Sequence, residues 1–358
     1  MTDVFALLSE LTHPPGPAGR EGPAVHAAAA LLAPLTDSVE IDRLGSLIGR
    51  KRCGRPDAPL LLLDAHLDEV GFVITGRAGG FLRFRTVGGI DPRVLPNQSV
   101  RLLGDPPGLG LVTCLPPHLQ SADSARVIPT DDLFIDTGLT EAEVARRFPV
   151  GTFCVFDAAC FSLGSGQCAG RALDDRAGFA VLLRALTLLG DTACAADLAV
   201  CGSVQEEAGF RGARAAAFGL RPDVCIAVDV THAHTPDAPP ARTFAPGGGP
   251  CIGVGPNCDR RLAAALTALA RARGIPFQIE AMEGSSGTNG WVLQTAGAGT
   301  ATAVLSVPLK YMHTPVETLR LDDLENTARL LCAFLSSQEL EELAPARGAA
   351  NRLGPVQK

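Results

Sequence analysis

Several features that would place a chain in a special class are missing from this 358-residue sequence. The longest apolar runs, residues 59–63 and 177–189, are too short or too interrupted by charge to span a bilayer. The N-terminus has neither a basic start nor a cleavage site, so we expect no secretory signal. These absences argue against a membrane protein and against a secreted one.

Positive charge and large aromatic residues are also scarce. The formal net charge is −7, and no dense cluster of Lys and Arg is present to hold a polyanion. This excludes nucleic acid as an expected partner. The chain has a single Trp and a single Tyr, which are few for the aromatic platforms on which sugars stack.

The cysteines do not form a recognisable framework. Their number, eleven, is odd, and no CxxC pair occurs. Cys154, Cys201, Cys225 and Cys332 lie inside apolar runs, where a reduced thiol packs as a small hydrophobic group. A thiolate metal site or a catalytic Cys therefore has little support, and a reducing, cytoplasmic compartment is expected.

The composition that remains is that of a globular α/β chain. Hydrophobic residues make up 46% and charged residues 19% of the sequence. Runs rich in Val, Ile and Leu predict buried strands at 60–64, 198–204, 224–230 and 301–307. Helical patterns follow at 177–189, 211–218 and 262–273. Their alternation predicts a mostly parallel sheet with helices on both faces.

One stretch interrupts this alternation. Between residues 71 and 165 the pattern changes to short β-like pieces broken by Gly and Pro, without a long helical period. We interpret it as an inserted β-domain, which makes the catalytic domain discontinuous over residues 1–70 and 166–340. The last residues, 341–358, are expected to form a tail.

Polar residues follow the first predicted strand and open the first long helix. His66 comes at the end of the strand, with Asp68 two residues later as a carboxylate that could orient its imidazole. Asp174 and Asp175 precede the helix, where aspartates commonly cap free N–H groups. One of them could bind metal while its neighbour caps the helix.

The later strands end in the same way. Glu206 and Glu207 follow an apolar strand side by side, so one carboxylate could bind a metal while the other faces the activated water. Asp229 ends the next strand, and His313 closely follows the last one. Each residue alone could be a polar group at a sheet edge, but together they form a ligand set that zinc and similar ions prefer.

These segments resemble one family, the TET-type (tetrahedral) aminopeptidases, which includes glutamyl and deblocking aminopeptidases and proteins labelled cellulase M. The matching stretches run in family order from about residue 10 to residue 335. They are AHLDEVGF, FLRFRTVGGIDPRVLP, the PPHL of LPPHLQS, DDLFIDTG, RALDDRAG, VQEEAGFRGA, AVDVTHA and YMHTPVE. The resemblance implies a zinc-peptidase-like α/β fold with a small inserted β-barrel.

The resemblance also implies two divalent metal ions per chain, with zinc or cobalt expected. One ion would be held by Asp174, Glu207 and His313. The other would be held by His66, Asp174 and Asp229, so that Asp174 bridges the pair. Glu206 would act as the general base and acid, and Asp68 would orient His66.

The implied activity is removal of N-terminal residues from peptide substrates. In this family the inserted domain covers the active site and mediates dimer contacts, from which tetrahedral dodecamers are built. We apply the family's dimer contact to this chain more readily than its dodecamer, because the assembly of dodecamers depends on surface details.

One departure from the family pattern concerns specificity. Where the family reads GTDA, this chain has SSGTNGW, so Asn289 replaces an acidic residue near the expected substrate-binding edge. The exchange either removes a negative charge that attracts the substrate's amino group or keeps the same hydrogen-bonding role. His232 and His234 are interpreted as loop residues.

Two other functions remain open from the residues. Paired carboxylates suggest a glycoside hydrolase, but Glu206 and Glu207 are too close in sequence to flank one glycosidic bond. Asn289 suggests a peptide-binding or assembly protein of the same fold that has lost turnover. The intact ligand set and Glu206 favour the aminopeptidase.

Overall fold

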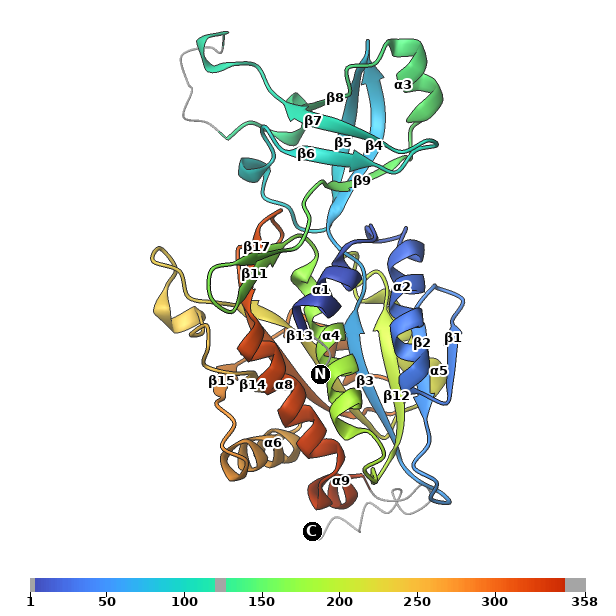
Figure 1. The fold of residues 1–358 in the computed structure, drawn as a ribbon, viewed down its shortest axis with the longest axis vertical. Coiled ribbons are helices and arrows are strands. Elements are labelled where there is room, and N and C mark those ends of the chain that lie inside the picture. The colour runs from blue at the N-terminus through green and yellow to red at the C-terminus, as the bar shows by residue number, and fades with distance from the viewer. Residues whose placement is uncertain (1–3, 120–126, 345–358) are drawn as a thin grey trace, which may run out of the picture.

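The apolar runs become the central strands of an eleven-stranded sheet. In the computed structural model, which describes residues 4–119 and 127–344, the central order is β12-β3-β13-β16, and these neighbours run parallel (Figure 1). Their bounds are β3 (Leu60–His66), β12 (Asp197–Ser203), β13 (Val224–His232) and β16 (Ala301–Lys310). Every residue of β3 is buried, as its continuous apolar run predicts. The four predicted strands are therefore confirmed, each with small changes at its ends.

Further strands complete both sides of the sheet, and all of them pair antiparallel except β15, which runs parallel to β14. The full order is β1-β2-β12-β3-β13-β16-β17-β11-β10, and β14 joins β16 to β15. The outer strands are β1 (Ser38–Ile41), β2 (Leu47–Lys51), β10 (Phe161–Leu163), β11 (Gln167–Gly170), β14 (Cys251–Val254), β15 (Gln278–Ala281) and β17 (Glu317–Arg320).

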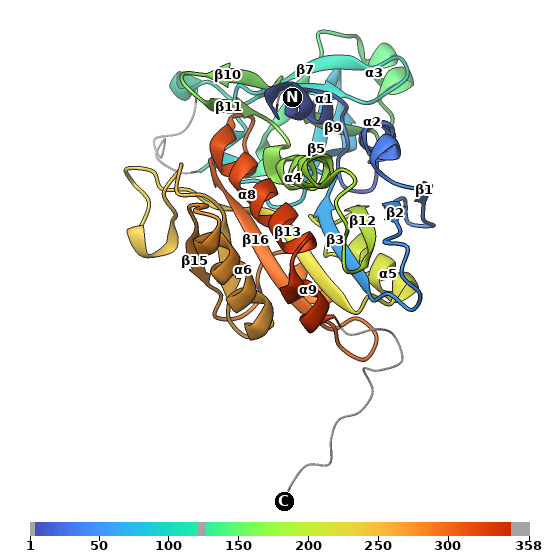
Figure 2. The ribbon, with the colours of Figure 1, turned by 60° about the horizontal axis from the view of Figure 1, so that its bottom comes forward.

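Helices cover both faces of this sheet, as predicted (Figure 2). The larger core lies beneath α1 (Val4–Thr12), α2 (Gly22–Leu32), α4 (Leu173–Leu189), α6 (Arg260–Ala272), α8 (Leu321–Leu335) and α9 (Gln338–Leu343). The smaller core on the opposite face lies beneath α5 (Arg211–Leu220) and α7 (Gly290–Leu293). Because successive strand residues alternate between the faces, the same strands contribute to both cores.

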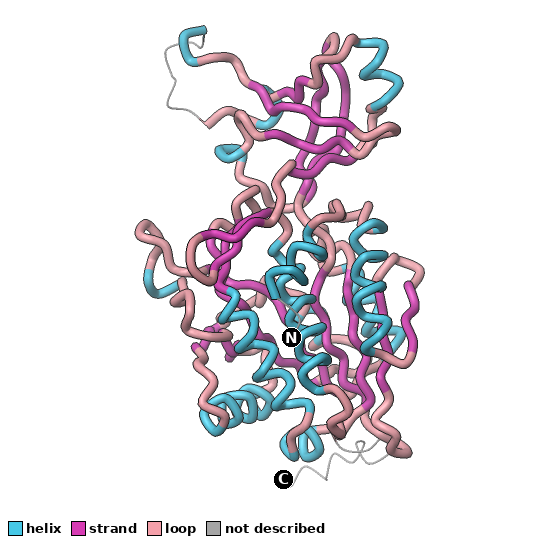
Figure 3. The backbone as a smooth tube through the Cα atoms, in the orientation of Figure 1, coloured by secondary structure: helices cyan, strands magenta, loops and turns pink. Residues whose placement is uncertain are grey.

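The segment between β3 and β10 forms a separate closed barrel, seen above the sheet in Figure 3. Its strands are β4 (Gly71–Ala78), β5 (Phe81–Val87), β6 (Ser99–Leu102), β7 (Gly108–Thr113), β8 (Phe134–Asp136) and β9 (Phe153–Phe156). Phe72 packs edge-to-face against Phe84 and Phe156 in the barrel interior. Helix α3 (Glu141–Arg147) begins at a capping box formed by Thr140 and Glu143.

The remaining elements are 3₁₀ helices in the connections, η1 (Ala33–Leu35), η2 (Pro92–Val94), η3 (Pro117–Leu119), η4 (Thr130–Asp132) and η5 (Pro240–Arg242). Strand β10 belongs to the large sheet although its residues fall in the range assigned to the insertion. Residues 345–358 of the predicted tail lie outside the described residues. Among the helices of residues 4–119 and 127–344, none has the length and apolar character needed to cross a bilayer.

Candidate active site

The predicted ligands come from elements that end at one edge of the sheet. His66 is the last residue of β3, and its register partner on β12 is Ser203, shortly before Glu206. Asp229 lies near the end of β13, and Asp174 lies at the start of α4. Since parallel strands present their carboxyl ends on the same side, residues far apart in sequence meet there.

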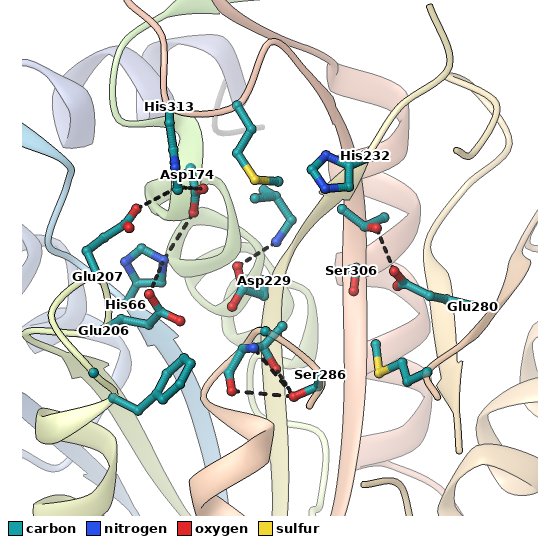
Figure 4. Close-up of a pocket in the computed structure, with 18 residues that line it drawn as sticks. His66, Asp174, Glu206, Glu207, Asp229, His232, Glu280, Ser286, Ser306 and His313 are labelled. Carbon is teal, nitrogen blue, oxygen red and sulfur yellow. Dashed lines mark hydrogen bonds and ion pairs between the residues drawn. The ribbon is translucent and has the colours of Figure 1, made fainter. Parts of the chain in front are cut away.

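Asp174 lies between the two histidines (Figure 4). Its Oδ1 is 3.1 Å from Nε2 of His66, and its Oδ2 is 3.2 Å from Nε2 of His313. One carboxylate therefore turns a different oxygen toward each imidazole. This is the arrangement that a bridging ligand requires.

The other predicted residues surround this pair. Glu207 Oε1 lies 3.0 Å from Nε2 of His313, and Glu206 Oε2 lies 4.0 Å from Nε2 of His66. Asp174, Glu207 and His313 place one possible ligand atom each within 4.8 Å of one another. Asp229 and His66 likewise each place one possible ligand atom within 4.8 Å of the other. The structure therefore brings all five predicted ligands together.

The charges of the site are strongly coupled. Burial alone would lower the pKa of His66 and His313, but their contacts with carboxylates outweigh it. The pKa of His313 rises to about 11 through Asp174 and Glu207. Burial opposes ionisation of Asp174 as well, yet both imidazoles hold its pKa below the ordinary value.

The other carboxylic acids of the site have raised pKa values. Burial, together with neighbouring carboxylates, raises the pKa of Glu206 to about 9 and that of Asp229 to about 8, against the opposing effect of His66. Carboxylates outnumber imidazoles in this buried cluster. Such an excess of negative charge among oxygen and imidazole donors fits divalent cations, so the residues present suit the two expected ions.

Asp175 has a structural role beside Asp174. Its Oδ1 accepts a hydrogen bond from the N–H of Gly178 at 2.9 Å, and its Oδ2 accepts one from the N–H of His66 at 3.3 Å. Asp174 and Asp175 do not have helical backbone angles, so Asp175 caps the regular part of α4. Asp175 also places a carboxylate oxygen within 4.8 Å of possible ligand atoms of His66 and Asp229. It is therefore an alternative to Asp174 as a metal ligand, and this alternative needs a test.

Asp68 contacts more than the imidazole it is expected to orient. Its Oδ1 lies 3.6 Å from Nδ1 of His66, while its backbone oxygen is closer, at 3.1 Å. Its two carboxylate oxygens accept the N–H groups of Glu206 and Glu207, both at 3.0 Å. The carboxylate therefore fixes the turn that presents both glutamates, which the sequence does not reveal.

Glu317 is a site residue that the sequence analysis missed. Its Oε2 accepts from the N–H of Leu173 at 2.7 Å and of Asp174 at 3.2 Å, and its Oε1 accepts from the N–H of His313 at 2.9 Å. One buried carboxylate thus holds the backbone of two predicted ligands. The available signal was an acid four residues after His313, within the motif YMHTPVE.

Asn289 lies beneath the cavity, not in its wall. It is 2% exposed, and its Nδ2 donates to Asp64 Oδ2 at 2.7 Å and to Ser203 Oγ at 2.8 Å. The preceding Thr288 lines the cavity, but Asn289 stands at the start of α7 and turns toward β3 and β12. The expected substrate contact of Asn289 therefore has no support in the geometry, which favours the hydrogen-bonding role.

This position allows a stability prediction. Burial raises the pKa of Asp64 to about 6. The native state therefore binds more protons than the unfolded state between pH 4 and 6, and stability falls as pH rises through that window. Asn289→Asp removes both donated hydrogen bonds and adds a second carboxyl group. We expect it to cost about 3 kcal/mol at pH 8 and clearly less at pH 5.

Urea unfolding at the two pH values measures this effect. Asn326→Asp, on α8 beside Arg329, is the matched control and should stay within about 0.5 kcal/mol of the parent chain. Equal stability of Asn289→Asp and the parent at pH 8 would contradict the structural role.

The two other histidines near the site differ from each other. His232 is the last residue of β13 and lines the cavity, so its interpretation as a loop residue is wrong. The strand is longer than its apolar run suggested because it pairs with β16 up to Leu309. His234 follows the strand, is exposed, and lies 3.2 Å from Thr243 Oγ1 through its Nδ1.

The ligands form one side of a cavity of about 480 Å³. This volume is within the usual range for small-molecule and substrate sites. The opposite side is made by residues from β13, β15, β16 and the loop before α7, shown in Figure 4. They include Thr231, His232, Glu280, Met282, Ser286 and Ser306.

Comparisons with known proteins agree over nearly the whole chain. The profile of the M42 glutamyl aminopeptidase family matches residues 45–330. Lysyl aminopeptidase of Pyrococcus furiosus is 34% identical, over 95% of this chain and 98% of that protein. Glutamyl aminopeptidase of Lactococcus lactis subsp. cremoris is 26% identical, over 96% of this chain and 98% of that protein.

Solved structures show the same similarity. An aminopeptidase from the archaeon Desulfurococcus kamchatkensis superimposes with a TM-score of 0.89 at 30% identity, covering 98% of this chain and 99% of the other. The TET1 peptidase of Pyrococcus horikoshii, which can assemble into a tetrahedron or a large octahedral shell, gives 0.82 at 32% identity. That match covers 93% of this chain and 99% of the other.

Proposed function

We propose that this chain, which belongs to the M42 glutamyl aminopeptidase family, removes N-terminal residues from peptides with two metal ions and Glu206. The observation that carries this proposal is the position of Asp174 between His66 and His313, with one carboxylate oxygen toward each. Asp174, Glu207 and His313 would hold one ion. His66, Asp174 and Asp229 would hold the other.

Each residue then has a separate task. Bound divalent ions would polarise the scissile carbonyl, lower the pKa of water and stabilise the negative charge of the transition state. Glu206 takes a proton from the attacking water and passes it to the nitrogen of the departing amine. Asp68 positions Glu206 by accepting its N–H, and Glu317 positions Asp174 in the same way.

Removal of metal provides the first test. We expect hydrolysis of aminoacyl anilides to fall by more than about 100-fold after treatment with a chelator, because the polarising charge is lost. Addition of zinc or cobalt should restore it, since imidazole and carboxylate ligands suit both ions. The control is chelator already saturated with zinc, which should leave activity unchanged. Full activity in the metal-free chain would contradict the proposal.

We further propose that the barrel forms a lid and a contact between two copies of the chain. This rests on the predicted division into residues 1–70 with 166–340 and the insertion 71–165. On strand β7, Leu109 and Leu111 are 61% and 56% exposed, and because they are two residues apart they lie on the same face of the strand. A second copy covering them would give a dimer, the unit from which a tetrahedral dodecamer could be built.

A cytoplasmic location is also part of the proposal. It is supported by the eleven cysteines, all of which have free thiols in the structure. Glycoside hydrolysis is the weaker alternative, because Glu206 and Glu207 both face imidazoles, His66 and His313 respectively. The relatives do not decide the preferred residue, since one is named for lysine and another for glutamate.

A further inference from the structure

A carboxylate outside the predicted ligand set faces the same cavity. Glu280, on β15, accepts a hydrogen bond at Oε1 from Thr231 Oγ1 at 2.6 Å. Its Oε2 is buried and makes no hydrogen bond of ordinary length within the described residues, but the Ser306 hydroxyl lies close enough to the carboxylate to lower its pKa. Glu280 lines the cavity across from the two histidines (Figure 4). A buried carboxylate oxygen left in this state needs a donor, and burial raises the pKa of Glu280 accordingly.

A hydroxyl group in the cavity wall lies beside this carboxylate. Ser306, on β16, is 1% exposed, and its Oγ makes no hydrogen bond of ordinary length within the described residues but interacts with Glu280. Ser306 is the register partner of Asp229, and Figure 4 shows it between Asp229 and Glu280. The side of the cavity away from His66 and His313 therefore carries one carboxylate, that of Glu280, with the hydroxyls of Thr231 and Ser306 beside it.

The spacing fits one side chain of a substrate. Thr231, which holds Glu280, is two residues beyond Asp229 on β13, a separation of about 6.6 Å along a strand. The α-amino group of a substrate must stay beside the scissile bond, near Asp229, so it cannot also reach that far. Met282, Phe210 and Met312 are among the residues that line the cavity, so it offers apolar surface to a hydrocarbon stem.

We propose that Glu280, with Ser306, selects peptides whose N-terminal residue is lysine. This inference rests on the proposed aminopeptidase function. An ammonium group on a four-carbon stem donates hydrogen bonds to the Glu280 carboxylate, which no cation among its hydrogen-bonding neighbours Thr231 and Ser306 pairs, and neutralises its charge. A neutral side chain leaves Glu280 unpaired, and an acidic one is repelled by it. Arginine ranks second, because Thr231 already occupies one of the two oxygens that its planar fork would engage.

The test compares lysyl and norleucyl anilides on the zinc-loaded chain. Norleucine keeps the straight stem and the α-amino group but lacks the ammonium. We expect kcat/KM to be about 100-fold higher for lysine. In Glu280→Gln the lysine value should fall about 100-fold, whereas norleucine should change by less than about 3-fold. The amide oxygen can still accept from Thr231, so the fold should be kept.

Two further results complete the test. Glu283→Gln removes the same charge from an exposed residue nearby and should change neither substrate. Equal cleavage of lysine and norleucine by the parent chain, or equal loss of both in Glu280→Gln, would overturn the role of Glu280 and leave the peptidase function intact. Failure of the zinc-loaded parent to cleave any aminoacyl anilide would instead overturn the proposed function itself.

Discussion

In Glu206→Gln, we expect kcat to fall by about 10³- to 10⁴-fold while both metal ions remain bound. Glu206 lines the cavity, with Oε2 at 4.0 Å from Nε2 of His66, but it is not one of the five predicted ligands. An amide has the same shape and cannot take up the proton of the attacking water. Steady-state kinetics together with metal analysis of the purified variant measures both quantities.

The adjacent glutamate provides the matched control. Glu207→Gln makes the same chemical change one residue later, but Glu207 contacts His313 at 3.0 Å and is a predicted ligand. We expect this variant to lose metal affinity, so that part of its activity returns at high zinc concentration. If zinc restored Glu206→Gln as well, Glu206 would be a ligand and its assignment as the base would be wrong.

Asp174→Asn should remove the shared ligand. An asparagine offers one oxygen and one NH₂ group, so it cannot present an acceptor to both His66 and His313 as Asp174 does. We expect no more than one metal ion per chain and a loss of at least about 10³-fold in kcat. Metal analysis after dialysis gives the stoichiometry, and thermal unfolding confirms that the variant is folded.

Asp175→Asn distinguishes Asp174 from its rival. Both oxygens of Asp175 accept backbone N–H groups, so this variant should lose stability but keep two ions. The opposite pattern, with ions lost from Asp175→Asn and kept by Asp174→Asn, would transfer the bridging role to Asp175.

The architecture, and the meeting of the five predicted ligands at one edge of the sheet, could be predicted from sequence because the strand patterns are local and the family resemblance supplied the choice among neighbouring carboxylates. The apolar run 60–64 predicted β3, and the polar residue that ended it, His66, is the residue that reaches the site. Parallel strands align their carboxyl ends, so residues at strand ends could be expected to meet even though their partners were unknown. Capping preferences predicted that one of Asp174 and Asp175 caps the helix, and the family resemblance supplied the choice of Asp174 as the bridging ligand.

Long-range contacts were not accessible in this way. Glu317 and Asp174 are 143 residues apart, and no local pattern shows that one accepts a hydrogen bond from the other. Asn289 donates to Asp64 across 225 residues. From sequence it could only be placed near the substrate, because the side of the loop that it faces depends on how α7 packs.

The composition of the cavity wall also could not be predicted from local sequence patterns. Glu280 lies on β15, a short strand at the margin of the sheet whose residues are only partly buried or exposed. Its importance comes from Thr231 and Ser306, which belong to two other strands. Only the folded chain shows that the Glu280 carboxylate lines the same cavity as the predicted metal ligands.

The most direct test of the account is a crystal structure of the chain grown with zinc, with anomalous data collected at the zinc absorption edge. We predict two anomalous peaks per chain, one beside each oxygen of Asp174. His66 and Asp229 should contact one peak, and Glu207 and His313 the other. Two empty positions at saturating zinc, or a single peak that Asp174 does not contact, would contradict the proposed metal centre.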